Sequence, residues 1–337
     1  MDIAFFELEN WQKQEIKQKL KNHRLAFFDS PLKEEHISKI KDTQVLGIFI
    51  YSKITADIID RLPKLRLIAT MSTGFDHIDI EYCKRKNIAV CNVPTYGENT
   101  VAEHTFALIL ALSRKLYPSV KRTRENHLFE TDISLRGFDL KGRTIGLIGC
   151  GNIGKHVARM AAGFEMDILV YDIYKDEKLA RKIGFRYAEF DDLLTESDVI
   201  SLHVPYNSKT HHLINEETIG RMKKGAHIIN TSRGAVIDTK ALVRGLESGK
   251  IAGVGIDVLE GEGEIKEEMA VLKDEFKSSS DLQTVLANHV LMKMDNVLIT
   301  PHNAFNSAEA LQRILNTTIE NIFSFSSGKK ENLVWQH

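Results

Sequence analysis

Three glycines, at positions 149, 151 and 154, have the spacing of a loop that binds phosphate groups. The apolar run TIGLI precedes them as a predicted strand (residues 144–148), and a predicted helix follows them (residues 155–162). In that setting the first glycine permits a tight turn, the second lets the backbone approach a pyrophosphate, and the third lets helix and strand pack closely. The start of the helix adds unpaired N–H groups and the positive end of its dipole. The residues of this predicted phosphate-binding loop are Gly149, Gly151, Asn152, Ile153 and Gly154.

An aspartate closes the next predicted strand. Asp172 comes directly after the apolar segment at residues 167–171, and it lies 18 residues beyond Gly154. An acidic side chain at this place in a dinucleotide-binding unit hydrogen-bonds the ribose hydroxyls, and its charge repels a 2′-phosphate. The glycine loop and the aspartate together predict that the chain binds NAD, in preference to NADP.

Further charged side chains that could do chemistry follow three separate predicted strands. Arg233, Asp257 and His302 each stand shortly after the residue at which a strand ends. The three strands are residues 227–230, 253–256 and 297–300. Carboxyl ends of parallel strands lie along one edge of a sheet, and ligands bind beyond that edge. We therefore expect these side chains to meet at one ligand site.

Short apolar runs alternate with helical segments along most of the chain, which predicts parallel sheets covered by helices. In the first part the predicted strands are residues 3–6, 25–28, 46–50, 67–70 and 89–91. In the second part they are residues 144–148, 168–171, 199–203, 227–230, 253–256 and 297–300. The predicted fold class is α/β, with two doubly wound, Rossmann-like parallel-sheet domains.

A long apolar helix, from about residue 100 to residue 124, separates the two alternating parts. A helical tail at residues 307–327 can return to the first part, so the second domain is expected to be inserted into the first. The predicted domains are residues 1–98 with 304–337, which would bind the substrate, and residues 99–303, which would bind NAD. The charged segment at residues 260–295 is long for a connection and is expected to be a surface insertion with its own helices.

The composition argues against several other classes of protein. Of 337 residues, 43% are hydrophobic and 27% are charged, and the net charge of −1 gives no basic footprint for nucleic acid. Three cysteines without metal-binding spacing argue against zinc and against a disulfide framework. The apolar run at residues 105–112 is too short to span a bilayer. We expect a cytoplasmic protein with no metal, no membrane partner and no nucleic-acid partner.

Several longer motifs resemble those of one enzyme family. They are GAHIINTSRGAVID at residues 225–238, GIDVLEGE at 255–262, TPH at 300–302 and TGFDHID at 73–79. Together they resemble the D-isomer-specific 2-hydroxyacid dehydrogenases, and the resemblance covers nearly the whole chain. It implies an oxidoreductase that moves a hydride between NAD and a small 2-keto or 2-hydroxy acid.

The resemblance assigns catalytic roles to three residues. Arg233 would hold the substrate carboxylate, because a guanidinium presents a planar fork of donors that matches it. His302 would exchange a proton with the substrate oxygen, and Glu262 would stabilise the imidazolium. The proline that often follows this glutamate in the family is replaced by Gly263, which weakens the assignment of Glu262. Asp257 would face the nicotinamide side.

Further binding residues follow from the same resemblance. The cofactor site would also include His203, Val204, Pro205, Thr210, Thr231 and Ser232. The substrate site would include backbone N–H groups of Thr73 and Gly74, the hydroxyl of Tyr96 and the ring of Phe305. Tyr96, in the motif NVPTY, stands where the members of the family that act on D-lactate carry a tyrosine. Phe305 replaces small residues of many relatives and could pack on a short side chain.

D-lactate and pyruvate are therefore the expected substrates, and a homodimer formed through the long helix is the expected assembly. Two alternatives remain at this point. The enzyme could act on phosphoglycerate or on a longer keto acid, although phosphoglycerate would require additional cations. The chain could also be a corepressor-like scaffold that senses NAD, since the three catalytic residues do not exclude that role.

Overall fold

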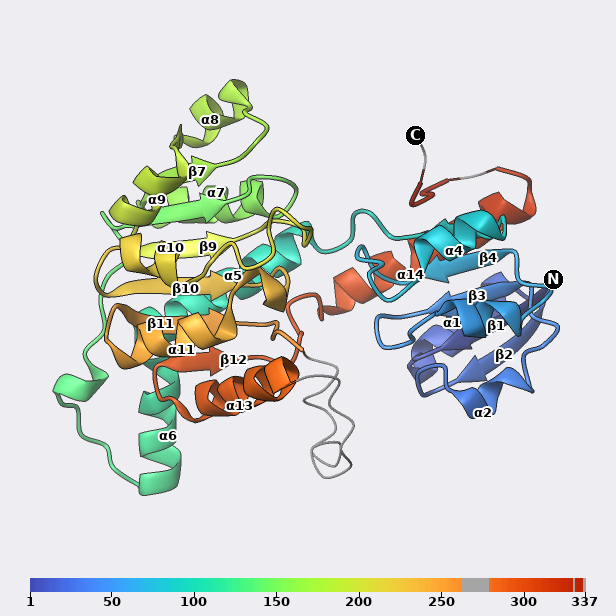
Figure 1. Cartoon of the computed structure of the whole chain (residues 1–337), viewed down its shortest axis with the longest axis horizontal. Helices are drawn as coiled ribbons and strands as arrows, with labels where there is room; N and C mark the ends of the chain where they lie inside the picture. Colours follow the sequence, from blue (N-terminus) through green and yellow to red (C-terminus); the bar gives the residue numbers. More distant parts are fainter. Residues whose placement is uncertain (262–278, 330, 336–337) are drawn as a thin grey trace. The chain divides into compact units, whose positions relative to one another are not determined.

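The computed structural model describes residues 1–261, 279–329 and 331–335. The chain forms two compact units (Figure 1). Unit 1 contains Met1–Tyr96 and Asn306–His337, and unit 2 contains Gly97–Phe305. Unit 2 is thus a continuous stretch inserted between two parts of unit 1. No helix of the described residues is both long enough and apolar enough to cross a membrane.

Unit 1 is built on a five-stranded parallel sheet with the strand order β2-β1-β3-β4-β5. Its strands are β1 (Asp2–Phe6), β2 (Arg24–Phe28), β3 (Val45–Ile48), β4 (Leu67–Thr70) and β5 (Ala89–Cys91). Its helices are α1 (Asn10–Lys19), α2 (Glu34–Ile37), α3 (Ala56–Asp60), α4 (Ile80–Arg85) and α14 (Ala308–Ser326). Strand order reverses between β1 and β3, which makes the sheet doubly wound.

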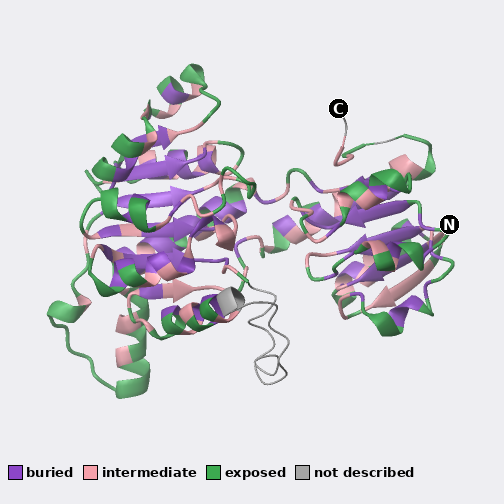
Figure 2. Cartoon of the chain, viewed as in Figure 1, coloured by how far each residue is buried: buried purple, intermediate pink, exposed green. Residues whose placement is uncertain are grey.

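Both faces of this sheet are covered. Alternate strand residues such as Ala4, Leu46 and Ile68 form one core with apolar side chains of α2, α3 and α4. Helix α14, the last helix of the chain, contacts α1 and β4 on the other side. The central strands of each sheet are drawn mostly as buried in Figure 2, as expected for a sheet between two helical layers, whereas the edge strand β2 has no buried residue.

Unit 2 contains a seven-stranded parallel sheet with the order β12-β11-β10-β9-β6-β7-β8. Its strands are β6 (Thr144–Ile148), β7 (Asp167–Tyr171), β8 (Arg186–Tyr187), β9 (Val199–Leu202), β10 (Ala226–Asn230), β11 (Ile251–Ile256) and β12 (Val297–Ile299). Its helices are α5 (Glu98–Ser113), α6 (Leu116–Asn126), α7 (Gly154–Gly163), α8 (Glu177–Ile183), α9 (Phe190–Glu196), α10 (Glu216–Arg221), α11 (Thr239–Glu247) and α13 (Ser279–Lys293). Single turns of 3-10 helix add η1 (Ile133–Leu135) and η2 (Gly234–Val236).

The two faces of the larger sheet have separate cores. Side chains of α9, α10, α11 and α13 pack with strand residues such as Ile148, Ile200 and Ile228 on one face. Side chains of α5, α7 and α8 pack with Ile145 and Leu147 on the other. Figure 1 shows α10 and α11 in front of the strands and α5 behind them. The predicted fold class, two doubly wound parallel sheets, is confirmed.

The prediction of one helix from about residue 100 to residue 124 is wrong. The chain forms α5, then a break in which Lys115 has a φ of 50° in the left-handed region, and then α6. Pro118 explains the break, because a continuous helix would need an N–H of Pro118 to bond the carbonyl of Arg114. The helix therefore ends before the proline and starts again with the proline in its first turn.

The prediction of a surface insertion at residues 260–295 is corrected for the part that the structure describes. Helix α13 buries Val285 and Leu291 in unit 2 and contacts α11 and β12. It lies in the chain between β11 and β12, which pair in parallel. Parallel neighbours need a crossover connection, and α13 is that connection. Residues 262–278 lie outside the described residues.

Candidate functional site

The glycine loop connects β6 to α7 at the carboxyl edge of the larger sheet. Gly149 has a φ of 94°, and a Cβ added there would lie 2.5 Å from the carbonyl oxygen of His203. A Cβ on Gly154 would lie 2.2 Å from the carbonyl oxygen of Gly149. At Gly151, by contrast, no heavy atom comes within 4 Å of an added Cβ. The first and third glycines are thus required by close packing inside the protein, whereas the second faces open space.

Asp172 follows β7 and lies beside the glycine loop. Its carboxylate accepts hydrogen bonds from the backbone N–H groups of Cys150, at 2.6 Å, and Tyr174, at 2.8 Å. These bonds hold the carboxylate at the rim of the loop. Burial raises the pKa of the Cys150 thiol to about 11, and the negative charge of Asp172 adds to the effect, so this cysteine stays protonated at neutral pH.

His203 follows β9, the strand on the other side of β6. Its backbone N–H donates to the carbonyl of Ile148 at 2.8 Å, and its Nε2 is 2.9 Å from the hydroxyl of Ser201. Its Nδ1 is buried without a hydrogen-bond partner among the described residues. Desolvation lowers the pKa of His203 to about 4, so the ring is neutral at pH 7.

The segment after His203 folds back on itself. The hydroxyl of Thr210 donates to the carbonyl of Pro205 at 2.7 Å and accepts from the N–H of Asn207 at 2.8 Å. A methyl of Val204 would contact a Cβ on Gly149 at 3.1 Å, so Val204 lies against the glycine loop. His203 and Val204 therefore adjoin the phosphate-binding loop, and Thr210 is bonded to Pro205 in the same segment.

The loop that carries Arg233 is shaped by Asn230, the last residue of β10. The Oδ1 of Asn230 accepts from the N–H and the hydroxyl of Ser232, and its Nδ2 donates to the carbonyl of Arg233 at 2.9 Å. The guanidinium of Arg233 donates from Nη1 to the carbonyl of Ser232 at 2.8 Å and is half-buried. A buried asparagine thus sets the path of the loop, and Gly234 is needed next because a Cβ there would overlap the backbone of Leu259.

The loop that carries His302 is held by Asp257, the residue after β11. Only 1% of Asp257 is exposed. Its carboxylate accepts from the N–H groups of Asn303, at 2.7 Å, and Ala304, at 2.8 Å, and from the hydroxyl of Thr300. Its backbone carbonyl accepts from the N–H of His302 at 2.8 Å. The carboxylate that was predicted to face the nicotinamide is therefore engaged by the loop of His302.

His302 has a φ of 53°, which is unusual for a residue with a side chain. The hydrogen bonds around Asp257 hold the backbone in this conformation. The imidazole is half-buried, and its centroid lies 6.5 Å from that of Phe305 in an edge-on arrangement. Phe305 thus stands beside the imidazole, as an aromatic wall of the same loop.

Neighbouring strands bring these loops together within unit 2. β10, β11 and β12 are adjacent and parallel, so Arg233, Asp257 and His302 all follow strands at the same edge. The glycine loop and Asp172 follow β6 and β7 along that edge. The sequence thus predicted correctly which strands precede these residues. Glu262, the predicted partner of His302, lies outside the described residues.

Unit 1 carries the other predicted substrate residues. Thr73 and Gly74 follow β4, and Tyr96 follows β5, its neighbour in the sheet. The hydroxyl of Thr73 donates to the carbonyl of Val93 at 2.7 Å. The hydroxyl of Ser72 donates to the carbonyl of Gly74 at 2.7 Å. Arg313 of α14 donates to the carbonyl of Tyr96. These bonds fix the two loops to each other and to α14.

Several supporting residues were not predicted. Glu7, after β1, has a half-buried carboxylate that accepts from the N–H groups of Phe49 and Tyr51 and so holds the loop after β3. Burial is the largest influence on Glu7 and raises the pKa of its carboxyl. His104 and Thr105 of α5 contact the loops of His302 and Arg233. Polar residues inside apolar segments are the only sequence signal that marks them.

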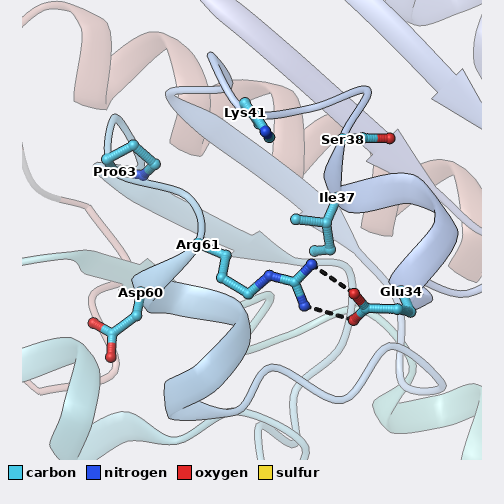
Figure 3. A pocket seen from close by; sticks show the side chains of 7 residues that line it. All are labelled: Glu34, Ile37, Ser38, Lys41, Asp60, Arg61 and Pro63. Carbon is cyan, nitrogen blue, oxygen red and sulfur yellow. Dashed lines mark hydrogen bonds and ion pairs between the residues drawn. The ribbon is translucent and has the colours of Figure 1, made fainter.

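A surface hollow of about 570 Å³ lies elsewhere on unit 1, between α2 and α3 (Figure 3). Arg61 and Glu34 face each other there as an ion pair at 2.5 Å, and Lys41 and Asp60 stand at its sides. None of the predicted site residues lines it. Since Arg61 and Glu34 are solvent-exposed and satisfy each other, the hollow offers no convergent chemistry.

Comparison with known proteins identifies the family. The family model described as "D-isomer specific 2-hydroxyacid dehydrogenase, NAD binding domain" matches residues 106–304. A protein of Zymomonas mobilis named 2-hydroxyacid dehydrogenase homolog is 34% identical over 98% of both chains. The chain belongs to the D-isomer-specific 2-hydroxyacid dehydrogenase family. This dehydrogenase is an NAD-dependent oxidoreductase.

Two further relatives of the dehydrogenase are informative about substrates. The D-lactate dehydrogenase of Aquifex aeolicus, solved with NAD and lactic acid, has a TM-score of 0.86 and 38% identity over 99% of both chains. A glyoxylate reductase of Korarchaeum cryptofilum is 36% identical over 91% of this chain and 87% of its own. Relatives of similar sequence identity are thus named for different small acids.

The described residues of the dehydrogenase fit NAD. The open space at Gly151 leaves room for a pyrophosphate, and the start of α7 supplies N–H groups to it. The carboxylate of Asp172, held beside the glycine loop, has the chemistry to accept hydrogen bonds from ribose hydroxyls, and its charge is unfavourable to a 2′-phosphate. Bound NAD supplies hydride transfer, and the protein supplies binding, orientation and electrostatics.

Proposed function

We propose that this D-2-hydroxyacid dehydrogenase interconverts pyruvate and D-lactate. The observation that supports the proposal is that two adjacent strands each end in a polar residue that holds a proposed catalytic loop. Asn230, at the end of β10, shapes the loop of Arg233, and Asp257, after β11, holds the loop of His302. Both loops follow adjacent strands of the sheet that carries the nucleotide loop. In the proposal, Arg233 supplies a cation and His302 supplies a proton beside the bound nicotinamide.

Arg233 has the task of binding the acid. Its guanidinium holds the substrate carboxylate through two parallel N–H donors and orients the keto group. His302 protonates the keto oxygen as hydride reaches the adjacent carbon, and it takes the proton back in the oxidation of D-lactate. Glu262 stabilises the protonated imidazole. Asp257 keeps the backbone of His302 in place through its own hydrogen bonds.

The cofactor residues have distinct tasks in the proposal. Gly149, Gly151, Asn152, Ile153 and Gly154 hold the pyrophosphate, and Asp172 holds the ribose. His203, Val204, Pro205 and Thr210 line the nucleotide on the β9 side, and Thr231 and Ser232 line it on the β10 side. Burial lowers the pKa of His203 to about 4, so its ring would contact the nucleotide as an uncharged group.

The substrate residues of unit 1 supply selectivity. Thr73 and Gly74 offer backbone N–H groups to the carboxylate, and Tyr96 adds its hydroxyl. Phe305, beside His302, packs on the methyl group of pyruvate. Glyoxylate is the main alternative substrate, because curated relatives at similar identity are glyoxylate reductases. Glyoxylate lacks the methyl group, so Phe305 would make no apolar contact with it.

A panel of keto acids tests the proposal. NADH and NADPH oxidation would be measured with pyruvate, glyoxylate, hydroxypyruvate, 2-ketobutyrate and phenylpyruvate, and the product of pyruvate would be tested for D configuration. We expect the highest kcat/KM with NADH and pyruvate. A higher kcat/KM with glyoxylate would make the enzyme a glyoxylate reductase. NADH binding without turnover of any acid would favour a scaffold.

We further propose that the enzyme is a cytoplasmic homodimer that uses α6. No side chain of α6 is buried, and the segment after it exposes large apolar side chains. Those exposed residues are Leu116, Tyr117, Val120, Leu128, Phe129 and Ile133. Exposed apolar side chains in such number are typical of interfaces between proteins. The three cysteines are free thiols whose pKa values are raised by burial, which suits a reducing compartment.

A further inference from the structure

Helix α5 contacts both catalytic loops through two consecutive residues. The Nε2 of His104 is 3.0 Å from the hydroxyl of Thr300, which precedes His302 by two residues. The hydroxyl of Thr105 is 3.0 Å from that of Thr231, which precedes Arg233 by two residues. We propose that His104 and Thr105 are positioning residues, His104 for His302 and Thr105 for Arg233. The proposal rests on the function proposed above.

The number of hydrogens available for donation fixes the direction of the hydrogen bonds at His104. A threonine hydroxyl has a single hydrogen, and Thr300 donates it to the carboxylate of Asp257. The contact between His104 and Thr300 therefore requires an N–H on the imidazole Nε2. His104 donates to Thr300, Thr300 donates to Asp257, and Asp257 accepts from the N–H groups of Asn303 and Ala304. A chain of bonds thus runs from α5 to the backbone beside His302.

The same argument applies at Thr105. Its hydroxyl donates to the carbonyl of Val101, one helical turn earlier, at 2.9 Å. The bond between the two threonine hydroxyls must then use the hydrogen of Thr231, which donates to Thr105. Both side chains are buried, with Thr105 fully inaccessible and Thr231 8% exposed. Loss of the acceptor would leave the hydroxyl of Thr231 without this buried partner.

The helix is a suitable support because it is tightly packed along its length. Phe106, Ile109 and Leu112 belong to the core that α5 shares with β6, β10 and α7. A Cβ on Gly255 of β11 would lie 3.0 Å from the Cβ of Leu108, so helix and strand are in direct contact. A closely packed helix holds a polar contact more precisely than a loop does, which is what catalytic geometry requires.

Four variants separate the two halves of the proposal. His104→Phe keeps a ring and removes the donor, and His104→Gln keeps an N–H donor. Thr105→Val keeps the shape and removes the acceptor, and Thr105→Ser restores it. Thr318→Val is the matched control, because Thr318 is also fully buried and also donates to the carbonyl one turn earlier, in α14. His289→Phe, on α13, is the control for the histidine.

The kinetic result should differ between the two loops. With the keto acid that the native enzyme reduces fastest, His104→Phe should lower kcat about tenfold with KM within twofold, because His302 moves the proton. Thr105→Val should raise KM about tenfold with a smaller change in kcat, because Arg233 binds the acid. His104→Gln and Thr105→Ser should recover most of the loss. Controls that lose as much activity, or variants that change kcat and KM alike, would overturn the proposal.

Amide hydrogen exchange of the complete protein gives a readout that does not depend on activity. His104→Phe should speed exchange in residues 302–304 only, and Thr105→Val in residues 231–236 only. Unchanged exchange in both loops would also overturn the proposal. Thr300→Val removes the hydroxyl that links His104 to Asp257, so it interrupts the same series of hydrogen bonds from the loop side. It replaces His104→Phe in the experiment if that variant does not fold. A native enzyme without keto-acid turnover would refute the proposed function, while the exchange result would still test the support.

Discussion

Gly151 and Gly154 lie three residues apart in the same loop but have opposite surroundings. A Cβ on Gly154 would lie 2.2 Å from the carbonyl oxygen of Gly149, whereas no heavy atom lies within 4 Å of a Cβ on Gly151. At Gly154 the fold itself requires a glycine. At Gly151 a glycine is required only when a ligand occupies the open space, and a pyrophosphate is the proposed ligand.

Alanine at each position should therefore fail in a different way. Gly151→Ala should leave the thermal unfolding temperature within about 2 °C of the native value, since no contact is disturbed, while weakening NADH at least tenfold, or roughly 1.4 kcal/mol. Gly154→Ala should lower the free energy of unfolding by about 1–3 kcal/mol through overpacking against the backbone. Calorimetry and NADH fluorescence titration measure both effects. Unchanged NADH affinity in Gly151→Ala would show that the pyrophosphate does not bind against this glycine.

Asp172 should control the choice between NADH and NADPH. Removing the carboxylate in Asp172→Ala eliminates the repulsion of a 2′-phosphate, so kcat/KM with NADPH should rise while that with NADH falls. The ratio of the two should shift by at least tenfold. Asp176→Ala, which removes a nearby carboxylate that caps α8, is the matched control. An unchanged ratio in Asp172→Ala would mean that another residue recognises the ribose.

His302 and Arg233 should separate proton transfer from binding of the acid. His302→Gln should lower kcat by about 10²–10⁴-fold, the usual contribution of a general acid, with NADH affinity unchanged. Arg233→Lys keeps the charge and loses the two-pronged geometry, so it should raise KM for pyruvate by more than tenfold. Steady-state kinetics with fluorescence titration of NADH distinguish the two. Loss of NADH binding in His302→Gln would contradict its assigned role.

Local sequence patterns were sufficient for the fold class and for the strands that precede the site. The glycine spacing, the aspartate after the next strand and the charged residues after three strands are all features of short segments. Doubly wound sheets then place strand ends at one edge without further information. The break before α6 was also readable in principle, because Pro118 cannot continue a helix.

The supports of the loops could not be read in this way. The contact between His104 and Thr300 joins residues 196 positions apart, and that between Thr105 and Thr231 joins residues 126 apart. Neither residue interrupts the helical pattern of α5. Asp257 was recognised as important, but the direction of its carboxylate depends on the N–H groups of a loop that the pattern does not describe.

Two histidines should make the stability of the protein depend on pH. Burial lowers the pKa of His227 to about 4, with the charges of Lys115 and Arg143 adding to the effect, and burial alone lowers that of His203 to about 4. Both rings are neutral in the folded protein and take up a proton more readily when it unfolds. Their stabilising effect is therefore complete above pH 6.5, and it should fall as the pH drops from 6.5 to 4.

Urea unfolding at several pH values measures this dependence. The midpoint for the native protein should decrease between pH 6.5 and 4, and His227→Gln should decrease less steeply because one of the two groups no longer titrates. His203→Gln should reduce the slope in the same way. A native midpoint that stays constant over this range would show that neither histidine is kept neutral by the fold.

The exposed surface of α6 should be covered by a second copy of the chain. Phe129 is 93% exposed, and Val120 and Tyr117 of α6 are also exposed, which is unfavourable for apolar groups of this size in a monomer. Most homo-oligomers are symmetric dimers, in which the same patch is used on both partners. A glutamate in the middle of such a patch would be buried opposite its own copy, so two like charges would face each other without solvent.

Val120→Glu and Phe129→Glu should therefore convert a dimer to a monomer. Leu286→Glu, at an exposed leucine of α13, is the matched control and should not. Light scattering after size exclusion measures the mass, and circular dichroism confirms that each variant is folded. Because the proposed site residues lie outside α6, the monomers should retain NADH binding, which separates assembly from the catalytic fold. If the native protein elutes as a monomer at micromolar concentration, this apolar surface does not form the proposed dimer interface.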